Sequence, residues 1–167
     1  MATDQDLEQE LEAVFRAYEE LWDRQDASEV IALWDQDDPE PFYLAEEQDD
    51  WRVGWDKLKD YWGPPGRNKT SETLRMRFHS IQAKLLAPDL AFASFWIRFD
   101  TKMVFLPKPI GNDSRASAVF RKKPEGWRLA AWTEAPQSPI VYVQKLYEMN
   151  VHPEFEQFSK DVADKSQ

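Results

Sequence analysis

The stretch from 90 to 103, LAFASFWIRFDTKM, constrains the fold of this chain more than any other part of it. Its apolar residues recur at every second position, and this is the period of a β-strand, whose successive side chains point to opposite faces. One face is almost wholly apolar, whereas the other begins apolar and ends with Arg98, Asp100 and Lys102. The pattern predicts a central strand in a sheet covered on both sides, which opens toward a ligand or water at its charged end.

Composition narrows the class of protein. The chain has 167 residues, of which 42% are hydrophobic and 14% aromatic, so we expect one globular domain with a substantial core. The formal net charge of −10 would repel phosphate backbones and anionic membranes, and nucleic acid and membranes are therefore not expected as partners. No apolar run approaches the ~20 residues of a membrane span and no signal peptide is evident, which indicates a cytoplasmic protein.

The residues available for metal or cofactor binding are few. Cysteine is absent, and the two histidines are His79 and His152, so neither a thiolate site nor a histidine-rich metal site is expected. The acidic run DQDDPEP, 35–41, lacks the glycine and the spaced ligands of a calcium loop and is typical of a solvated turn. No glycine-rich phosphate loop occurs either. We therefore expect neither a metal nor a cofactor.

Periodicity and breaker residues predict an α+β order of elements. Thr3 and Asp26 are expected to cap the first two helices, Gly63–Gly66 to end the third, and the strand after it to bend near His79–Ser80. A loop is predicted over 107–113 and a polar tail after 153. The predicted helices span 4–24, 26–34, 51–62 and 140–150, and the predicted strands span 41–46, 73–86, 90–103, 114–122 and 127–134.

This order predicts a curved, mainly antiparallel sheet packed against N-terminal helices, with a cone-shaped hollow between them. Residues 1–136 would form the main part of the domain, and 137–167 a C-terminal helical extension of it.

Four segments carry a resemblance to a known family: AYEELWDRQDASEVIALWD, VGWDKLKDYW, PDLAFASFWIRF and SRASAVFRKKPEGWRLAAWTE. They resemble the NTF2-like superfamily in its SnoaL-like branch, over about residues 7–136. The resemblance implies an α+β cone and a homodimer formed through the outer sheet surface. It does not imply one activity, since this fold hosts isomerases, dehydratases, epoxide hydrolases, cyclases, lyases and non-catalytic modules. The family often has a histidine in the final strand, where this chain has 130-AAWT-133, and this departure argues against a histidine-based dehydratase.

The strongest candidate for chemistry is a group of ionisable residues on two predicted strands. Arg98 and Asp100 share one strand face, Lys102 follows, and Glu134 ends the last strand. An arginine can hold two carboxylates ionised, and such a carboxylate can take a proton or orient water. The set is similar to the acid–arginine–acid arrangement of epoxide hydrolases in this superfamily. The alternative is a cross-strand salt bridge at the rim of the sheet.

Other polar candidates each have a structural alternative. Lys102 beside an apolar loop could act as a base, or be a surface lysine. Tyr43 could donate to a developing oxyanion, or pack in the core. His79 lies at the suspected bend, where side chains can be re-aimed, and Arg115 could neutralise an anionic ligand or lie at the surface. The aromatic residues expected to line the cavity, or else to fill the core, are Tyr18, Trp22, Trp34, Trp55, Trp62, Phe78 and Trp132.

These features predict a cofactor-independent lyase that acts on a hydrophobic aromatic molecule by acid–base chemistry. Within the family that the chain resembles, bacterial lyases that deformylate lignin-derived diarylpropanes to stilbenes would fit such a pocket. The alternatives are an epoxide hydrolase or isomerase, and a non-catalytic dimeric binding module. A cavity lined by the candidate polar groups would favour an enzyme, and a filled interior with Arg98 and Asp100 in solvent would favour the module.

Overall fold

The computed structural model describes residues 4–62 and 70–164, which belong to two compact units, 1–136 and 137–167. The first unit contains, in order, α1 (Asp4–Asp23), the 3₁₀ helix η1 (Ala27–Leu33), β1 (Phe42–Leu44), β2 (Arg52–Val53), α2 (Trp55–Trp62), β3 (Ser71–Ala87), β4 (Leu90–Met103), β5 (Ile110–Lys123) and β6 (Gly126–Ala135). The second unit contains α3 (Pro139–Met149) and α4 (Phe155–Asp164).

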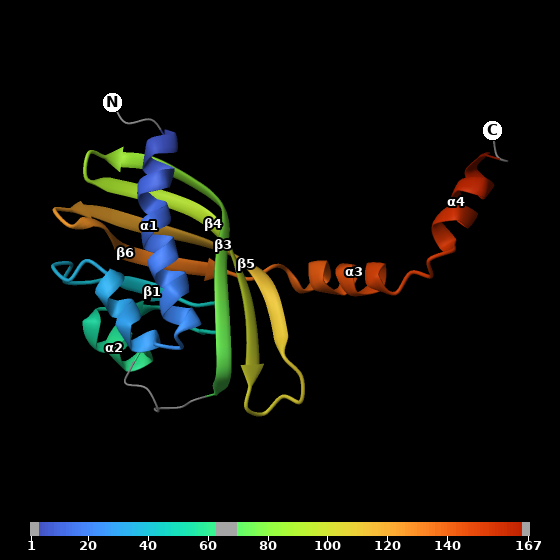
Figure 1. Ribbon diagram of the computed structural model, residues 1–167, viewed down its shortest axis with the longest axis horizontal. Helices are drawn as coiled ribbons and strands as arrows, with labels where there is room; N and C mark the ends of the chain where they lie inside the picture. The colour runs from blue at the N-terminus through green and yellow to red at the C-terminus, as the bar shows by residue number, and fades with distance from the viewer. Residues whose placement is uncertain (1–3, 63–69, 165–167) are drawn as a thin grey trace. The chain divides into compact units, whose positions relative to one another are not determined.

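A six-stranded sheet in the order β2-β1-β6-β5-β4-β3 forms the body of the first unit. Strands β3 to β6 make an antiparallel meander, whereas β1 pairs parallel with β6. Helix α1 lies across one face of this sheet (Figure 1). The predicted α+β architecture, with a curved, mostly antiparallel sheet against N-terminal helices and helices at the C-terminal end, is confirmed.

The two faces of the sheet differ in what covers them. We call the face against α1 the inner face: it carries Phe95 and Ile97, which are buried together with Leu11 and Phe15 of the helix. We call the opposite face the outer face: it carries Trp96 and the charged residues that follow it. No described residue of the first unit packs over Trp96 as a second layer, and β4 is one strand away from the sheet edge. The prediction that both faces of β4 are covered is therefore wrong, whereas its place inside the sheet, paired with a strand on each side, and its bounds are as predicted.

Strand β3 is an edge strand, and side chains of α1 and the turn after it occupy its free backbone donors. The amide N–H of Leu74 donates to Gln25 Oε1 (2.9 Å), that of Phe78 to Glu19 Oε1 (2.8 Å) and that of Ala83 to Glu8 Oε1 (3.3 Å). Gln25 also donates through Nε2 to the Leu74 carbonyl (2.8 Å). The helix therefore satisfies part of the edge that would otherwise be open to another strand.

The bend predicted near His79–Ser80 is present as a bulge. The pairing of β3 with β4 shifts register between His79 and Gln82, and Ser80 has a φ of 54°. A residue in this left-handed region turns the strand, so the side chains before and after it follow different parities.

Several local predictions were wrong. Residues 110–113 extend β5 instead of forming a loop, because the long β4 provides pairing partners as far as Thr101. The 3₁₀ helix η1 has no side-chain cap from Asp26, whose carboxylate accepts a hydrogen bond from Ser28 (2.8 Å). Two elements were missed, the two-residue β2 and helix α4. The predicted cap at Thr3 and helix stop at Gly63–Gly66 lie outside the described residues.

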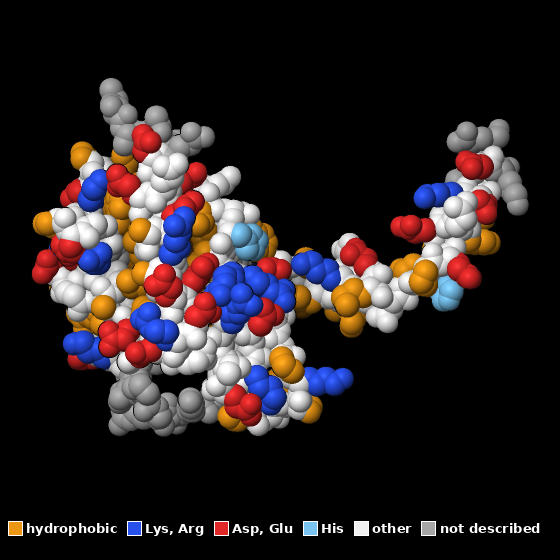
Figure 2. Space-filling view, viewed as in Figure 1, with side chains coloured by type: hydrophobic (Ala, Val, Ile, Leu, Met, Phe, Trp, Pro, Cys, Tyr) orange, Lys and Arg blue, Asp and Glu red, His pale blue; other side chains and the backbone are white. Residues whose placement is uncertain are grey.

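The second unit exposes many apolar side chains. Ile140, Tyr147 and Met149 of α3 are 74%, 74% and 83% exposed, and Phe155 and Phe158 of α4 contact each other at the surface. Figure 2 shows hydrophobic side chains along both helices. None of the described helices is long and apolar enough to cross a membrane.

Candidate active site

A carboxyl group lies beside a group of aromatic rings on the inner face. Glu134 pairs across the sheet with Ala116, so it shares the inner face with Trp132 two residues earlier. Glu134 Oε1 accepts a hydrogen bond from Trp132 Nε1 (2.8 Å), and Oε2 accepts one from the backbone N–H of Glu46 (3.1 Å). Both carboxyl oxygens are thereby held in place by residues from two parts of the chain.

Removal from water raises the pKa of Glu134 from 4.5 to about 7. The hydrogen bonds from Trp132 and Glu46 oppose this rise, whereas the charges of Glu47 and Glu46 add to it. Near neutral pH the carboxyl is therefore populated in both protonation states, which is the condition under which one group can both accept and return a proton.

Aromatic rings surround this carboxyl on the inner face. The Tyr18 ring stacks on Trp132 with a centroid distance of 5.2 Å and an interplanar angle of 6°, and Phe78 contacts both rings edge-on. Trp62 contacts Tyr43 at 5.2 Å and Trp22 at 5.9 Å. We call these residues the aromatic cluster: Tyr18, Trp22, Tyr43, Tyr61, Trp62, Phe78, Phe95 and Trp132.

The three tyrosines of the cluster remain protonated. Burial raises the pKa of Tyr18, Tyr43 and Tyr61, and the negative charge of Glu134 adds to this effect at each of them. Tyr43 and Tyr61 share a hydrogen bond, and the Tyr61 hydroxyl donates to Glu47 Oε1 (2.7 Å). The cluster thus offers neutral phenols as hydrogen-bond donors next to a carboxyl that changes charge near pH 7.

Several polar side-chain atoms in and around the cluster are buried without a hydrogen-bond partner among the described residues. They include Nε1 of Trp22, Trp34 and Trp62, Oγ of Ser114 and Oε2 of Glu46. The Trp22 nitrogen lies beside Tyr18 and lowers the pKa of that phenol against the effect of burial, but the two atoms are outside hydrogen-bond geometry. Buried polar atoms are nearly always paired, so unpaired donors are characteristic of a place where a ligand binds.

The residues expected to form an acid–arginine–acid group are separated by the sheet. Arg98 Nη2 lies 2.8 Å from Asp100 Oδ1, and Nη1 lies 3.6 Å from Asp113 Oδ2. All three project from the outer face, and the side chains of Arg98 and Asp100 are 45% and 53% exposed. The second acid is therefore Asp113 and not Glu134, which lies on the inner face. Register decides this, because Arg98 is directly opposite Asp113 in β5.

The other predicted polar residues also lie outside the cluster. His79 stacks near Trp96 (6.3 Å) with Nε2 3.6 Å from Asp113 Oδ1 on the outer face. Lys102 donates to the Leu106 carbonyl (2.7 Å) and pairs with Glu72 (3.5 Å). Arg115 donates to the carbonyl of Pro136 (2.8 Å). Of the predicted catalytic residues, only Tyr43 and Glu134 lie at the aromatic cluster, whereas Arg98, Asp100 and His79 gather around Asp113 on the outer face.

Most of the predicted aromatic lining does come together. Tyr18, Trp22, Trp62, Phe78 and Trp132 belong to the cluster, and Trp34 contacts it edge-on through Tyr43 at 6.2 Å. Trp55 is different, since its indole N–H donates to the Asp38 carbonyl (2.7 Å) and Lys59 lies over its ring.

The rings touch one another where a hollow was expected, and two described cavities lie elsewhere. One, of about 320 Å³, is lined by polar groups that include Asp23, Arg75, Asp100 and Lys102. It therefore contains two candidate residues but none of the predicted aromatic lining.

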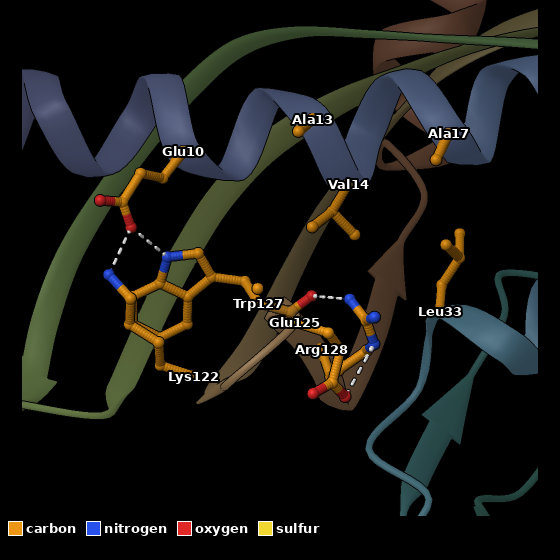
Figure 3. A pocket seen from close by; sticks show the side chains of 10 residues that line it. Glu10, Ala13, Val14, Ala17, Leu33, Lys122, Glu125, Trp127 and Arg128 are labelled. Carbon is orange, nitrogen blue, oxygen red and sulfur yellow. Dashed lines mark hydrogen bonds and ion pairs between the residues drawn. The ribbon is translucent and has the colours of Figure 1, made fainter.

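The second described cavity, of about 420 Å³, lies between α1 and the β5–β6 hairpin (Figure 3). Its charged groups are already paired: Glu10 accepts hydrogen bonds from Lys122 (2.8 Å) and Trp127 (2.7 Å), and Arg128 pairs with Glu125 (3.7 Å). The charged side chains drawn around this cavity therefore already pair with one another.

Sequence reasoning missed Tyr61, Ser114 and the backbone contribution of Glu46. Tyr61 precedes Trp62 in α2, where the spacing of the tryptophans drew attention to the neighbouring helix face. Ser114 is 1% exposed at the start of a run of alternating small residues, which was the available signal that its hydroxyl faces inward. In the described ranges no three histidine or acidic side chains are grouped closely enough to hold a metal ion.

Comparison with known proteins identifies the fold. No family model matches the sequence, and no curated protein matches it. A candidate dehydratase of the NTF2-like family from Streptomyces avermitilis has a TM-score of 0.67 and 15% identity, covering 81% of this chain and 99% of that one. A candidate scytalone dehydratase from Novosphingobium aromaticivorans has a TM-score of 0.66 and 12% identity, covering 78% and 83%.

A third solved structure comes from a different functional class. It is a candidate calcium/calmodulin-dependent protein kinase II association domain from Xanthomonas campestris, with a TM-score of 0.64 and 15% identity, covering 78% of this chain and 87% of that one. The chain therefore has the NTF2-like fold, and proteins of this fold include candidate enzymes as well as a candidate association domain. At these identities the likeness concerns the fold alone.

Proposed function

We propose that this protein is a cofactor-independent lyase that acts on a hydrophobic aromatic alcohol, with Glu134 as the group that moves the proton. The observation that carries the proposal is a carboxyl whose pKa is about 7, held by two hydrogen bonds against stacked aromatic rings. An apolar, ring-lined environment suits an aromatic substrate, and the neighbouring phenols can donate hydrogen bonds to its oxygen atoms.

One carboxyl of this kind can serve both halves of an elimination. The Glu134 carboxylate would take a proton from the substrate as the new double bond forms, and the resulting carboxylic acid would return it to the departing hydroxyl, which leaves as water. For a 1,2-diarylpropane-1,3-diol the proton would come from the primary hydroxyl. The adjoining carbon–carbon bond would break to release formaldehyde, and the benzylic hydroxyl would leave, so that the products are a stilbene, formaldehyde and water.

A substrate ring would have to separate existing ring contacts. Trp22, Tyr61 and Phe78 are the partly exposed members of the cluster, whereas its other members are buried. We propose that a ring enters beside Trp22 and Tyr61 and takes up contacts that these side chains now make.

The test is turnover of 1,2-diphenylpropane-1,3-diol by the purified chain. We expect near-ultraviolet absorbance from the stilbene and an equal amount of formaldehyde. The Glu134→Gln variant should lose at least about 100-fold in rate, the usual contribution of a general acid–base group. Asp100→Asn is the matched control on the outer face and should retain the wild-type rate. If Asp100→Asn abolished turnover while Glu134→Gln did not, the assignment of Glu134 would be wrong.

We also propose a homodimer through the outer face. The half-buried side chains of Phe92, Trp96 and Val119 lie there between polar residues, which is the composition of an interface core. The interior rings in contact with one another and the exposed Arg98 and Asp100 together meet the condition set above for a non-catalytic dimeric binding module, which is therefore the second candidate. Absence of turnover on aromatic diols together with a stable dimer would support the module. An epoxide hydrolase or isomerase that uses Glu134 would turn over the matching epoxide or ketone instead.

A further inference from the structure

We infer that the indole N–H groups of Trp22 and Trp62 form a binding site for an acceptor oxygen of an aromatic ligand, and a carbonyl oxygen is the acceptor that tests it. This inference rests on the proposed function only in placing the ligand in the aromatic cluster. It concerns which part of the ligand these two residues hold, and it does not depend on the reaction.

The first step is that both groups can only donate. An indole nitrogen carries one N–H and no acceptor lone pair, so its partner must be an acceptor. Both nitrogens are buried, and neither has a partner among the residues that the structure describes. The whole Trp62 side chain is 4% exposed, and water is therefore not freely available to it.

The second step is that the two donors belong to one place. The rings of Trp22 and Trp62 are 5.9 Å apart between centroids and inclined at 57° to each other, so a ligand that reaches one ring also reaches the other. They come from different elements, α1 and α2, which meet only in the folded unit. Two unpaired donors on neighbouring rings differ from a single unpaired atom, since one bound molecule can supply acceptors to both.

The third step is that no acceptor among the described residues is bonded to either indole. Glu134 accepts from Trp132 and Glu46, and Glu47 accepts from Tyr61. The phenol oxygens of Tyr18 and Tyr43 can accept as well as donate, and Oε2 of Glu46 is buried without a partner, but none of them makes a hydrogen bond to Trp22 or Trp62. A ligand that supplies an acceptor would pair the two indoles. A carbonyl oxygen does so without adding a further donor.

The position of the proposed oxygen site can be compared with that of the Glu134 carboxyl. Tyr18 lies beside Trp22 on α1 and stacks on Trp132, whose N–H holds Glu134. A ligand ring placed against Trp22 and Trp62 would thus be separated from the Glu134 carboxyl by one layer of aromatic side chains.

The test compares two ligands of the same shape. Acetophenone has a carbonyl oxygen where α-methylstyrene has a methylene group. In ¹⁵N-labelled protein, we expect acetophenone to move the Trp22 and Trp62 indole N–H resonances downfield, as new hydrogen bonds do. We expect α-methylstyrene to broaden or move ring signals of the cluster without a downfield shift of either N–H. Trp22→Phe and Trp62→Phe assign the two resonances, since each keeps an aromatic ring and removes one N–H.

Affinity provides the second readout. Each substitution should weaken acetophenone binding about 2- to 12-fold, the worth of one neutral hydrogen bond, and leave the affinity for α-methylstyrene unchanged. Trp51→Phe is the control, because Trp51 is 43% exposed and contacts Phe42 outside the cluster. Equal shifts with both ligands, or no indole shift at saturating acetophenone, would overturn the inference. These measurements need no turnover, so failure of the diol assay would count against the proposed lyase and not against the acceptor site.

Discussion

Individual side chains determine how this protein should respond to pH. The folded-state pKa of Glu134, about 7, is higher than its ordinary value of 4.5, so the folded chain binds this proton more tightly than the unfolded chain. The stabilisation that Glu134 contributes to the folded state is fully present below pH 4.5 and is lost as the pH rises through 7. A shift of this size corresponds to about 3 kcal/mol.

This pH dependence gives a test that is independent of any substrate. Glu134→Gln removes the titrating group. Between pH 4.5 and 8, the unfolding free energy of the wild type should therefore fall by about 3 kcal/mol relative to that of the variant. Urea unfolding at several pH values measures it. Parallel curves for the two proteins would show that Glu134 titrates normally and would remove the basis of its proposed role.

Residue identity was easier to foresee than residue neighbours. Glu134 and Tyr43 were both recognised as candidates, Glu134 as an acid at the end of the last predicted strand and Tyr43 as a phenol that could donate to a developing oxyanion. Their meeting depends on β1 pairing with β6, which no local pattern indicates. Arg98 illustrates the opposite case: the alternation of β4 assigns its face correctly, but its second carboxylate partner depends on register, which selected Asp113.

Among the elements, α1 has a second role besides covering the core. Its carboxylates accept hydrogen bonds from the edge of β3, as Glu19 does from the Phe78 N–H at 2.8 Å. Glu19→Ala should lower the unfolding free energy by about 1 kcal/mol through the lost hydrogen bond, and should increase light scattering on heating, since a free strand edge can pair with another chain.

The matched control for this substitution is Glu20→Ala, which changes helix propensity in the same way at an exposed neighbouring position. We expect it to be neutral or slightly stabilising, and to leave the scattering unchanged. If both variants behaved alike, the edge hydrogen bond would have no measurable effect on stability.

Helices and strands were predicted correctly where a single hydrophobic period dominates the sequence. Strand β4 has the predicted bounds, and the β3 bulge lies where the apolar parity changes. Residues 110–113 were predicted as a loop because Pro107, Pro109 and Gly111 suggest one, whereas a long partner strand extends the pairing through them. Helix α4 was missed although Phe155, Phe158 and Val162 have helical spacing, because the surrounding residues are polar.

For the molecule as a whole, the proposed homodimer is tested at its outer face. Trp96→Arg places a charge among half-buried apolar side chains and should convert a dimer into a monomer at the same concentration. Light scattering coupled to size-exclusion chromatography measures the mass. Glu20→Arg on α1, a charge change of the same sign on the opposite side of the sheet, should leave the mass unchanged. A wild-type chain that is monomeric at high concentration would contradict the proposal.

The parallel pairing of β1 with β6 affects how the candidate site comes into being. The hydrogen bond between the Glu46 N–H and Glu134 joins residues 88 positions apart in sequence, and the stack of Tyr18 on Trp132 spans a still longer stretch of chain. During synthesis, a growing polypeptide that has emerged only as far as β5 already displays Tyr18 and Tyr43 without their partners in β6. The ribosome must therefore release nearly the entire first unit before those rings can be shielded, and chaperones would meet them first.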